Sequence, residues 1–220
     1  MIENLSYTYK PKTVYIIGNA FGWSTIIFSL AFSNSKILAI DAGIEGKDNL
    51  IGIKLTNDII KTEKFNSFVE YGCSPIDNKK YIGKHFGINK LDLVFIDGLH
   101  TNEQILKDFY GVLDFCHDKT IFLFHDVVNW GMEKSFNKIC NYLRDKDYES
   151  RLLYRTTSGM GCCYPLSLNR EIKCIFNYFS EKEGHILRLK NDLKMKMKMK
   201  RSLRYILPIN FIKLIKKVIK

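Results

Sequence analysis

Four side chains that can do acid–base or metal chemistry follow two apolar segments of the chain. Asp97 and His100 come just after one segment, and His125 and Asp126 end the other. Apolar runs of this length, rich in Val, Ile, Leu and Phe, are typical of buried central strands in a parallel sheet. Such sheets bind ligands at the carboxyl ends of their strands, so we expect the four groups to share one crevice. Two carboxylates and two imidazoles there can hold a divalent metal, act as a general base, or do both.

A glycine-containing turn follows the first predicted strand and opens a helix. Residues 18–25 read Gly-Asn-Ala-Phe-Gly-Trp-Ser-Thr. Glycines let the backbone approach a ligand closely, and free N–H groups at the helix start favour a polar or anionic group. A dinucleotide fingerprint would have a third glycine near Trp23, and its absence argues against NAD. The alternative is a tight strand-to-helix connection without a ligand.

Two further strand ends complete a predicted adenosine site. Asp41 ends the second strand about 20 residues after the glycine turn, where a carboxylate can accept both ribose hydroxyls. The alternative role for Asp41 is to cap the loop that contains Gly43. Gly72, Cys73 and Ser74 follow the third strand, where the adenine edge would be read, although Ser74 can equally be a helix N-cap.

The elements that must position these residues alternate between strand-like and helix-like patterns. Strands are predicted at residues 13–17, 36–40, 65–71, 91–96, 121–125, 151–156 and 161–164, and helices at 23–32, 76–86, 102–116 and 132–143. This alternation predicts an α/β fold, a Rossmann-like three-layer sandwich with a mainly parallel seven-stranded sheet and a helical C-terminal extension. The carboxyl ends of its parallel strands all lie at one edge, which is where the candidate residues fall.

With these motifs in place, the chain resembles class I S-adenosylmethionine-dependent methyltransferases over about residues 10–165. More narrowly, it is similar to the small bacterial methyltransferases marked by a Phe-Ile-Asp-Gly-x-His strand end and a later His-Asp strand end, which are relatives of the catechol O-methyltransferase group. These motifs are residues 95–100 and 125–126 here. The resemblance implies a methyltransferase domain at residues 1–170, followed by a basic helical extension at residues 171–220.

The resemblance also implies roles for particular residues. The glycine turn would hold the methionine part of S-adenosylmethionine and Asp41 its ribose. The full set of expected cofactor-binding residues is Gly18, Ala20, Phe21, Gly22, Ser24, Thr25, Asp41, Cys73, Ser74 and Asp97. Metal-using members of the family coordinate Mg²⁺ through acids that match Asp97 and Asp126. The chain departs from the family at His125, where metal-using relatives often have another acid, and at Ile16, where relatives commonly have Glu.

The expected catalytic residues are His100, His125 and Asp126. Methyl transfer from a sulfonium requires alignment of the acceptor, worth ~7–11 kcal/mol, and removal of its proton, worth ~10²–10⁴-fold. Imidazoles suit the base role because their reference pKa is near neutrality. A metal held by Asp97 and Asp126 would instead lower the pKa of the acceptor hydroxyl. The alternative for both histidines is a purely structural role.

The net charge of the chain comes from its C-terminal segment. Residues 185–220 hold 12 of the 34 Lys and Arg residues and one of the 23 acids, so the rest of the chain is neutral. This segregation makes nucleic acid an unlikely partner. Residues 205–220 include a basic amphipathic pattern, which predicts binding to an anionic membrane surface, to a partner's groove or to the chain's own domain. Six cysteines without CxxC spacing, and no signal peptide, predict a reducing cytoplasm.

These observations predict a cytoplasmic O-methyltransferase that is peripheral on the inner face of the plasma membrane. We expect it to methylate a small polar or sugar hydroxyl, a small-molecule or glycan acceptor, in surface polysaccharide biosynthesis. One alternative is an RNA or protein methyltransferase whose basic tail grips the substrate. The other is a non-catalytic module of the same fold that tethers a partner to a membrane.

Overall fold

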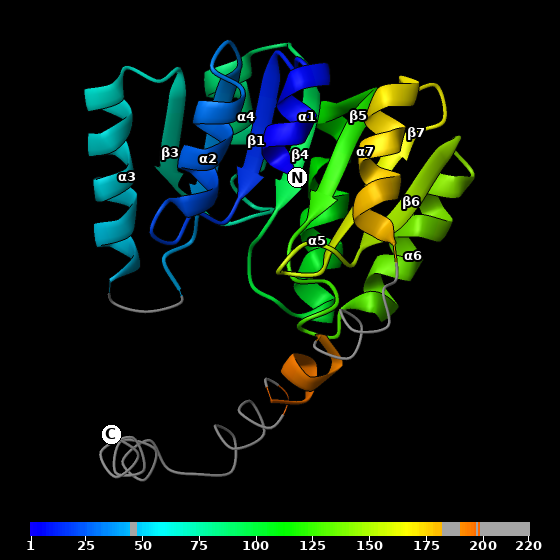
Figure 1. Ribbon diagram of the computed structural model, residues 1–220. Coiled ribbons are helices and arrows are strands. Elements are labelled where there is room, and N and C mark those ends of the chain that lie inside the picture. The colour runs from blue at the N-terminus through cyan, green and yellow to red at the C-terminus, as the bar shows by residue number, and fades with distance from the viewer. Residues whose placement is uncertain (45–47, 182–189, 197, 199–220) are drawn as a thin grey trace, which may run out of the picture.

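The computed structural model describes residues 1–44, 48–181, 190–196 and 198. Their strands form one sheet between two layers of helices (Figure 1). The strands are β1 (Thr13–Ile17), β2 (Lys36–Asp41), β3 (Ser67–Tyr71), β4 (Leu91–Ile96), β5 (Cys116–Phe124), β6 (Tyr148–Leu153) and β7 (Met160–Pro165). The helices are α1 (Ile2–Thr8), α2 (Trp23–Ala31), α3 (Asn49–Glu63), α4 (Asn78–Phe86), α5 (Asn102–Val112), the 3₁₀ turn η1 (Leu113–Phe115), α6 (Glu133–Arg144) and α7 (Arg170–Ser180). Residues 190–196 are helical as well.

The order of the strands fixes where a ligand can bind. It is β3-β2-β1-β4-β5-β7-β6, with β1 to β5 parallel and β7 antiparallel to both of its neighbours. Because β1 lies between β2 and β4, the chain leaves the centre of the sheet in opposite directions, and a crevice opens at the carboxyl ends of these strands. The predicted fold class is therefore confirmed.

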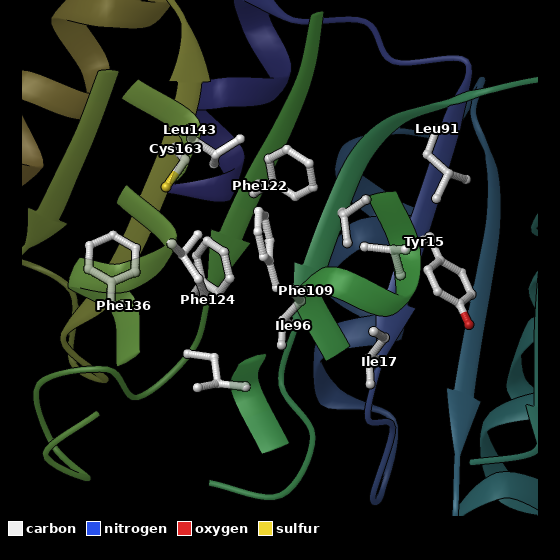
Figure 2. Packing of buried hydrophobic residues seen from close by; sticks show 14 of the residues in the cluster. Tyr15, Ile17, Leu91, Ile96, Phe109, Phe122, Phe124, Phe136, Leu143 and Cys163 are labelled. Carbon is white, nitrogen blue, oxygen red and sulfur yellow. The ribbon is translucent and has the colours of Figure 1, made fainter. Parts of the chain in front are cut away.

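Both faces of the sheet are covered, which explains why its central strands are apolar throughout. Along β1, Tyr15 and Ile17 face a core formed with α4, α5 and α6, and Val14 and Ile16 face a second core formed with α1, α2, α3 and α7. All of these side chains are buried. Figure 2 shows the first core, in which Phe109 of α5 packs against Phe122 and Phe124 of β5. Burial on two faces removes the alternation that a half-exposed strand would show.

The structure corrects several predicted boundaries. β5 begins at Cys116, where helix was predicted, because α5 stops at Val112 and polar residues extend the strand beyond its apolar part. β6 begins at Tyr148 and not at residue 151, since it lies at the sheet edge and is half-exposed. Helix α3 was not predicted. Several of its apolar residues, such as Leu50 and Leu55, are exposed, and this weakens the helical pattern.

The C-terminal part of the described chain packs on the domain. Ile172 and Phe176 of α7 are buried in the second core, and the Phe176 ring stacks on Tyr164 of β7 at 4.9 Å between centroids. The division of the chain at residue 170 stays a prediction. The predicted amphipathic segment at residues 205–220 lies outside the described residues. Among the helices that are described, none combines the length and the apolar content needed to cross a bilayer.

Candidate active site

The glycine turn after β1 is held against the end of β4. Gly18 has φ +97°, and a Cβ there would lie 2.0 Å from the Asp97 carbonyl oxygen. Gly22 has φ +87° and is the N-cap residue of α2; a Cβ there would lie 2.2 Å from Thr56 Oγ1. Only glycine combines this conformation with such close contacts, so both positions are required to shape the turn. The turn leaves the amide groups at the start of α2 next to the crevice.

Asp41 fastens the same turn to the end of β2. Its Oδ2 accepts hydrogen bonds from the backbone N–H groups of Asn19 and Ala20, both at 2.7 Å. Its Oδ1 accepts from the N–H of Gly43, also at 2.7 Å, so the loop-capping alternative raised from the sequence is seen as well. Among the described residues, Oδ1 accepts only this one hydrogen bond and keeps a second lone pair, and Asp41 lines the cavity described next. Holding the loops and accepting a hydroxyl are therefore compatible roles.

A cavity of about 510 Å³ lies over the carboxyl ends of the parallel strands. The residues predicted from sequence that line it are Gly18, Ala20, Phe21, Ser24, Asp41, Gly72, Cys73, Ser74, Asp97, His100 and His125. Three other predicted residues do not line it. Gly22 caps α2, and Thr25 is fully buried and donates to Asn19 Oδ1 at 2.7 Å. Asp126 contacts the two histidines but does not reach the cavity wall.

Several lining residues were missed by the sequence analysis. They are Ile17, Asn19, Trp23, Ile27, Ile40, Ala42, Ile44, Gly98, Leu99, Gln104 and Asp108. Most of them are neighbours of predicted residues in the same turns, which was the available signal. Gln104 and Asp108 are different, because they belong to α5 and lie one helical turn apart. Their spacing puts them on one face of the helix, but only the tertiary structure shows that this face borders the cavity.

The four candidate catalytic groups converge as expected. Asp97 Oδ1 lies 3.2 Å from His100 Nε2 and 2.9 Å from His125 Nδ1. Asp126 Oδ2 lies 3.8 Å from His100 Nε2 and 3.6 Å from His125 Nδ1. The other oxygen of Asp97 accepts from Ser24 Oγ at 3.1 Å, which connects this cluster to the glycine turn. The buried Nδ1 of His125 makes no aligned hydrogen bond. Its contact with Asp97 is therefore electrostatic, because the angle does not suit a hydrogen bond.

These contacts shift the pKa of two groups in opposite directions. Burial by itself would raise the pKa of Asp97, but contact with His100 and His125 outweighs burial and holds this pKa below its ordinary value. Burial would lower the pKa of His125, whereas the nearby charges of Asp97 and Asp126 raise it above 6.5. The pair therefore favours a carboxylate beside an imidazolium. Proton uptake by His125 is easier here than in water.

The cluster also has the dimensions of a metal site. The donor atoms of Asp97, His100 and His125 all lie within 4.8 Å of one another. Separations between neighbouring ligands of about 3.0–3.6 Å are expected around a metal with bonds of about 2.0–2.2 Å. Two imidazole nitrogens with carboxylate oxygens suit Mn²⁺, Fe²⁺ or Zn²⁺, whereas Mg²⁺ takes oxygen ligands. The donor set thus fits a transition metal better than the predicted Mg²⁺ on Asp97 and Asp126.

The loop after β5 forms the outer wall of this cluster. Asp126 has φ +55°, which is unusual for a residue other than glycine, and its Oδ1 accepts from Asn129 Nδ2 at 3.2 Å. Trp130 stacks on His100, with ring centroids 5.2 Å apart and planes 27° apart. Backbone strain of this kind persists only where surrounding contacts enforce it, and it is concentrated at functional sites. Trp130 limits the directions in which His100 can turn.

The helical segment at residues 190–196 packs on the same loops (Figure 1). Lys190 is buried and donates to the Thr156 carbonyl, and the charge of Asp126 acts on its ammonium. Lys194 pairs with Glu133 Oε1 at 2.6 Å. The segment therefore joins the β5–α6 connection to the β6–β7 connection, at the sheet edge that carries the cavity. Part of the basic extension therefore packs on loops that neighbour the candidate site.

A family model described as a methyltransferase domain matches residues 16–127 of the chain, which is half of its length. The chain belongs to this methyltransferase family. The match runs from β1 to just beyond Asp126, so it contains the glycine turn, Asp41 and the whole histidine–aspartate cluster. The predicted membership of the S-adenosylmethionine-dependent methyltransferases is confirmed. No curated protein sequence matches this methyltransferase significantly.

Solved structures of other methyltransferases share the fold at low sequence identity. A candidate caffeoyl-CoA O-methyltransferase from Staphylococcus aureus is 14% identical, with a TM-score of 0.58, and the match covers 74% of this chain and 80% of that one. An O-methyltransferase from Bacillus cereus in complex with S-adenosylhomocysteine is 15% identical (TM-score 0.56, 74% and 78% covered). A TDP-rhamnose 3'-O-methyltransferase of calicheamicin biosynthesis is 14% identical (TM-score 0.55, 73% and 74% covered).

Proposed function

We propose that this methyltransferase transfers the methyl group of S-adenosylmethionine to a hydroxyl oxygen of a small polar acceptor. The observation that carries the proposal is the convergence of two imidazoles and two carboxylates at one end of the cavity. A sulfonium donor already carries positive charge, so the reaction needs alignment of the acceptor and removal of its proton. A cluster that can take up a proton suits an acceptor hydroxyl, whose proton must leave as the new bond forms.

The cofactor fits along the cavity from the glycine turn to Ser74. Its methionine part would lie against the backbone of Gly18 and Ala20, and a ribose hydroxyl would donate to Asp41 Oδ1. The methyl group would then point toward Asp97 and the two histidines. Apolar side chains between these polar points, among them Ile44 and Leu99, suit the faces of an adenine ring.

His125 and His100 are the proposed bases. Either imidazole can take the proton that leaves the substrate hydroxyl. Asp97 and Asp126 then stabilise the imidazolium that results. A divalent ion, when bound by Asp97, His100, His125 and Asp126, would lower the pKa of the acceptor hydroxyl. The residues fit such an ion, and we infer from their nitrogen donors that Mn²⁺, Fe²⁺ or Zn²⁺ binds more tightly than Mg²⁺.

The acceptor proposed from the sequence is a sugar hydroxyl in surface polysaccharide biosynthesis. One structural neighbour is a TDP-rhamnose 3'-O-methyltransferase, which supports a sugar acceptor on this fold. The basic amphipathic pattern at residues 205–220 supports a location at the inner face of the plasma membrane. The sugar acceptor is thus proposed from the structural neighbour, and the membrane location from the sequence pattern.

Calorimetric titration tests cofactor binding. The full-length protein should bind S-adenosylhomocysteine, and Asp41→Ala should lose most of this affinity while keeping its fold. Thermal shifts provide a second measure, because a ligand that binds only the native state raises the melting temperature. Stabilisation by NADH in place of S-adenosylhomocysteine would contradict the proposal.

Transfer of a labelled methyl group tests the acceptor class. Nucleotide-linked sugars, free sugars and catechols should be compared, with product NMR to locate the new methyl group on oxygen. Parallel assays are made in EDTA and again after Mn²⁺, Zn²⁺ or Mg²⁺ is added back. They distinguish catalysis that needs a metal from catalysis by an imidazole base alone. Full activity in EDTA would eliminate the metal. Methylation of nitrogen or carbon alone would contradict the proposed O-methyltransfer.

A further inference from the structure

A buried carboxyl group of α5 borders the cavity at a point that the chemistry above does not use. Asp108 is 1% exposed and lines the cavity together with Gln104, one helical turn before it. A Cβ at Gly98 would lie 3.0 Å from Asp108 Oδ2, so this carboxyl group reaches the backbone that follows β4. The absence of a side chain at Gly98 leaves room beside the carboxyl oxygen.

Asp108 belongs to a small polar group in surroundings that are otherwise apolar. Gln104 Nε2 donates to Asp108 Oδ1 at 2.8 Å and to the Ser74 carbonyl at 3.1 Å. The Ser74 hydroxyl is buried and makes no aligned hydrogen bond, although it lies close enough to Asp108 to lower that pKa. Ala42, Ile44 and Leu99 supply apolar wall nearby. A cavity wall that combines apolar side chains with a few polar groups suits a nucleobase.

Burial disfavours the charged form of the Asp108 carboxyl group. It raises the pKa of Asp108 to about 6, so the carboxylate that forms at neutral pH is held in a poorly solvated place. A carboxyl group that is buried and also lines a cavity is a candidate ligand-binding group. Gln104 satisfies one of the two carboxylate oxygens, and the other lies toward Gly98, which also lines the cavity.

The position of Asp108 in the cavity indicates which part of the proposed cofactor it would contact. If the ribose lies on Asp41 and the methyl group lies near His125, the base must occupy the remaining part of the cavity, which Ser74, Leu99, Gln104 and Asp108 line. Adenine presents an amino group on its Watson–Crick edge, and a carboxylate accepts hydrogen bonds but donates none. Hypoxanthine has a carbonyl oxygen in place of that amino group, and a carboxylate repels it.

We propose that Asp108 is a specificity-determining residue that accepts a hydrogen bond from the exocyclic amino group of adenine, with Ser74 and Gln104 beside it. The inference rests on the proposed use of S-adenosylmethionine and adds to it the group that distinguishes the base. Asp108 takes no part in methyl transfer itself. Its expected effect is therefore on cofactor affinity and selectivity and not on the chemical step.

The test compares S-adenosylhomocysteine with S-inosylhomocysteine, its deaminated analogue, by calorimetric titration of the full-length protein at pH 8. The wild type should bind the adenine compound at least ~10-fold more tightly, as expected for a hydrogen bond to a charged group. Asp108→Asn should bring the two affinities within about threefold, because an amide can donate to the carbonyl oxygen of the analogue. Ser74→Ala should reduce the discrimination partly.

Asp41→Asn is the matched control within the same cavity. It should lower the affinity for both ligands by the same factor, since both carry the same ribose. Equal binding of the two ligands by the wild type, or unchanged discrimination in Asp108→Asn, would overturn the role of Asp108 while leaving cofactor use intact. Failure of the wild type to bind S-adenosylhomocysteine at all would overturn the proposed function and this inference with it.

Discussion

At the scale of single residues, Asp97 organises the acceptor end of the cavity. One of its oxygens faces both imidazoles and the other accepts from Ser24 at 3.1 Å. This carboxylate therefore links the glycine turn, where the methyl donor would lie, to the groups that would receive a proton. Its pKa is held below the ordinary value by the two histidines against the effect of burial.

Replacement of His125 tests the base. His125→Ala should lower turnover by ~10²-fold or more and leave affinity for S-adenosylhomocysteine nearly unchanged, because the side chain acts on the acceptor. The pKa of His125 is raised, and a base must be unprotonated, so activity measured in EDTA should increase with pH through a value above 6.5. A pH profile of the wild type that is flat between pH 6 and 9 would exclude a histidine base.

Asp108→Asn should make the free protein more stable. The pKa of Asp108 is raised from 3.8 to about 6 because burial penalises its charged form, so native stability falls as the pH rises between these values. The asparagine variant avoids this loss. Its advantage should be near zero at pH 4 and reach up to ~3 kcal/mol above pH 6, at ~1.4 kcal/mol for each pKa unit.

Urea unfolding of both proteins at several pH values measures this advantage. Gln104, Ser74 and Lys107 lower the pKa of Asp108 against the effect of burial, and the pKa of about 6 is the net result. A pH-independent difference between the two proteins would contradict the assigned pKa shift.

At the scale of elements, the crevice depends on a turn that passes close to the end of β4. Gly18→Ala should destabilise the fold by about 1–3 kcal/mol and abolish cofactor binding, because a Cβ at φ +97° would lie 2.0 Å from the Asp97 carbonyl oxygen. Gly83→Ala is the control. It lies within α4 with nothing within 4 Å of its Cβ position, so it should stabilise the protein by about 0.5–1 kcal/mol. Thermal unfolding of both variants checks the pair.

At the scale of the whole molecule, the basic extension has two parts with different expected roles. Residues 190–196 contact the domain through Lys190 and Lys194, whereas the amphipathic pattern of residues 205–220 is expected to bind anionic membrane. A chain that ends at residue 198 should keep its melting temperature and cofactor affinity but no longer sediment with anionic vesicles. A chain that ends at residue 184 should lose stability as well.

Salt distinguishes the two forces that can hold residues 205–220 on a membrane. Charge attraction is screened within about 8 Å at physiological ionic strength, whereas apolar insertion is barely affected. Partial sedimentation of the full chain at high salt, lost when Ile215 and Ile219 are changed to Ser, would indicate insertion. Equal sedimentation of the full chain and the chain ending at residue 198 would refute the predicted membrane role.

The sequence by itself was sufficient for the central sheet and for about half of the residues that line the cavity. Apolar runs reveal β1, β2 and β4 because both of their faces are buried, and each run ends at the edge where ligands bind. The edge strand β6, the polar start of β5 and helix α3 were placed wrongly or missed, since residues in contact with water carry no strong apolar period.

Only the tertiary structure decided which side chains meet. Asp108 and Gln104 read in the sequence as the polar face of an amphipathic helix, and the packing of α5 beside β4 turns that face toward the cavity. Lys190 reads as part of the basic C-terminal segment, but it is buried against the Thr156 carbonyl. Local pattern records whether a residue prefers water or the core, whereas contacts between residues far apart in sequence depend on how complete elements pack.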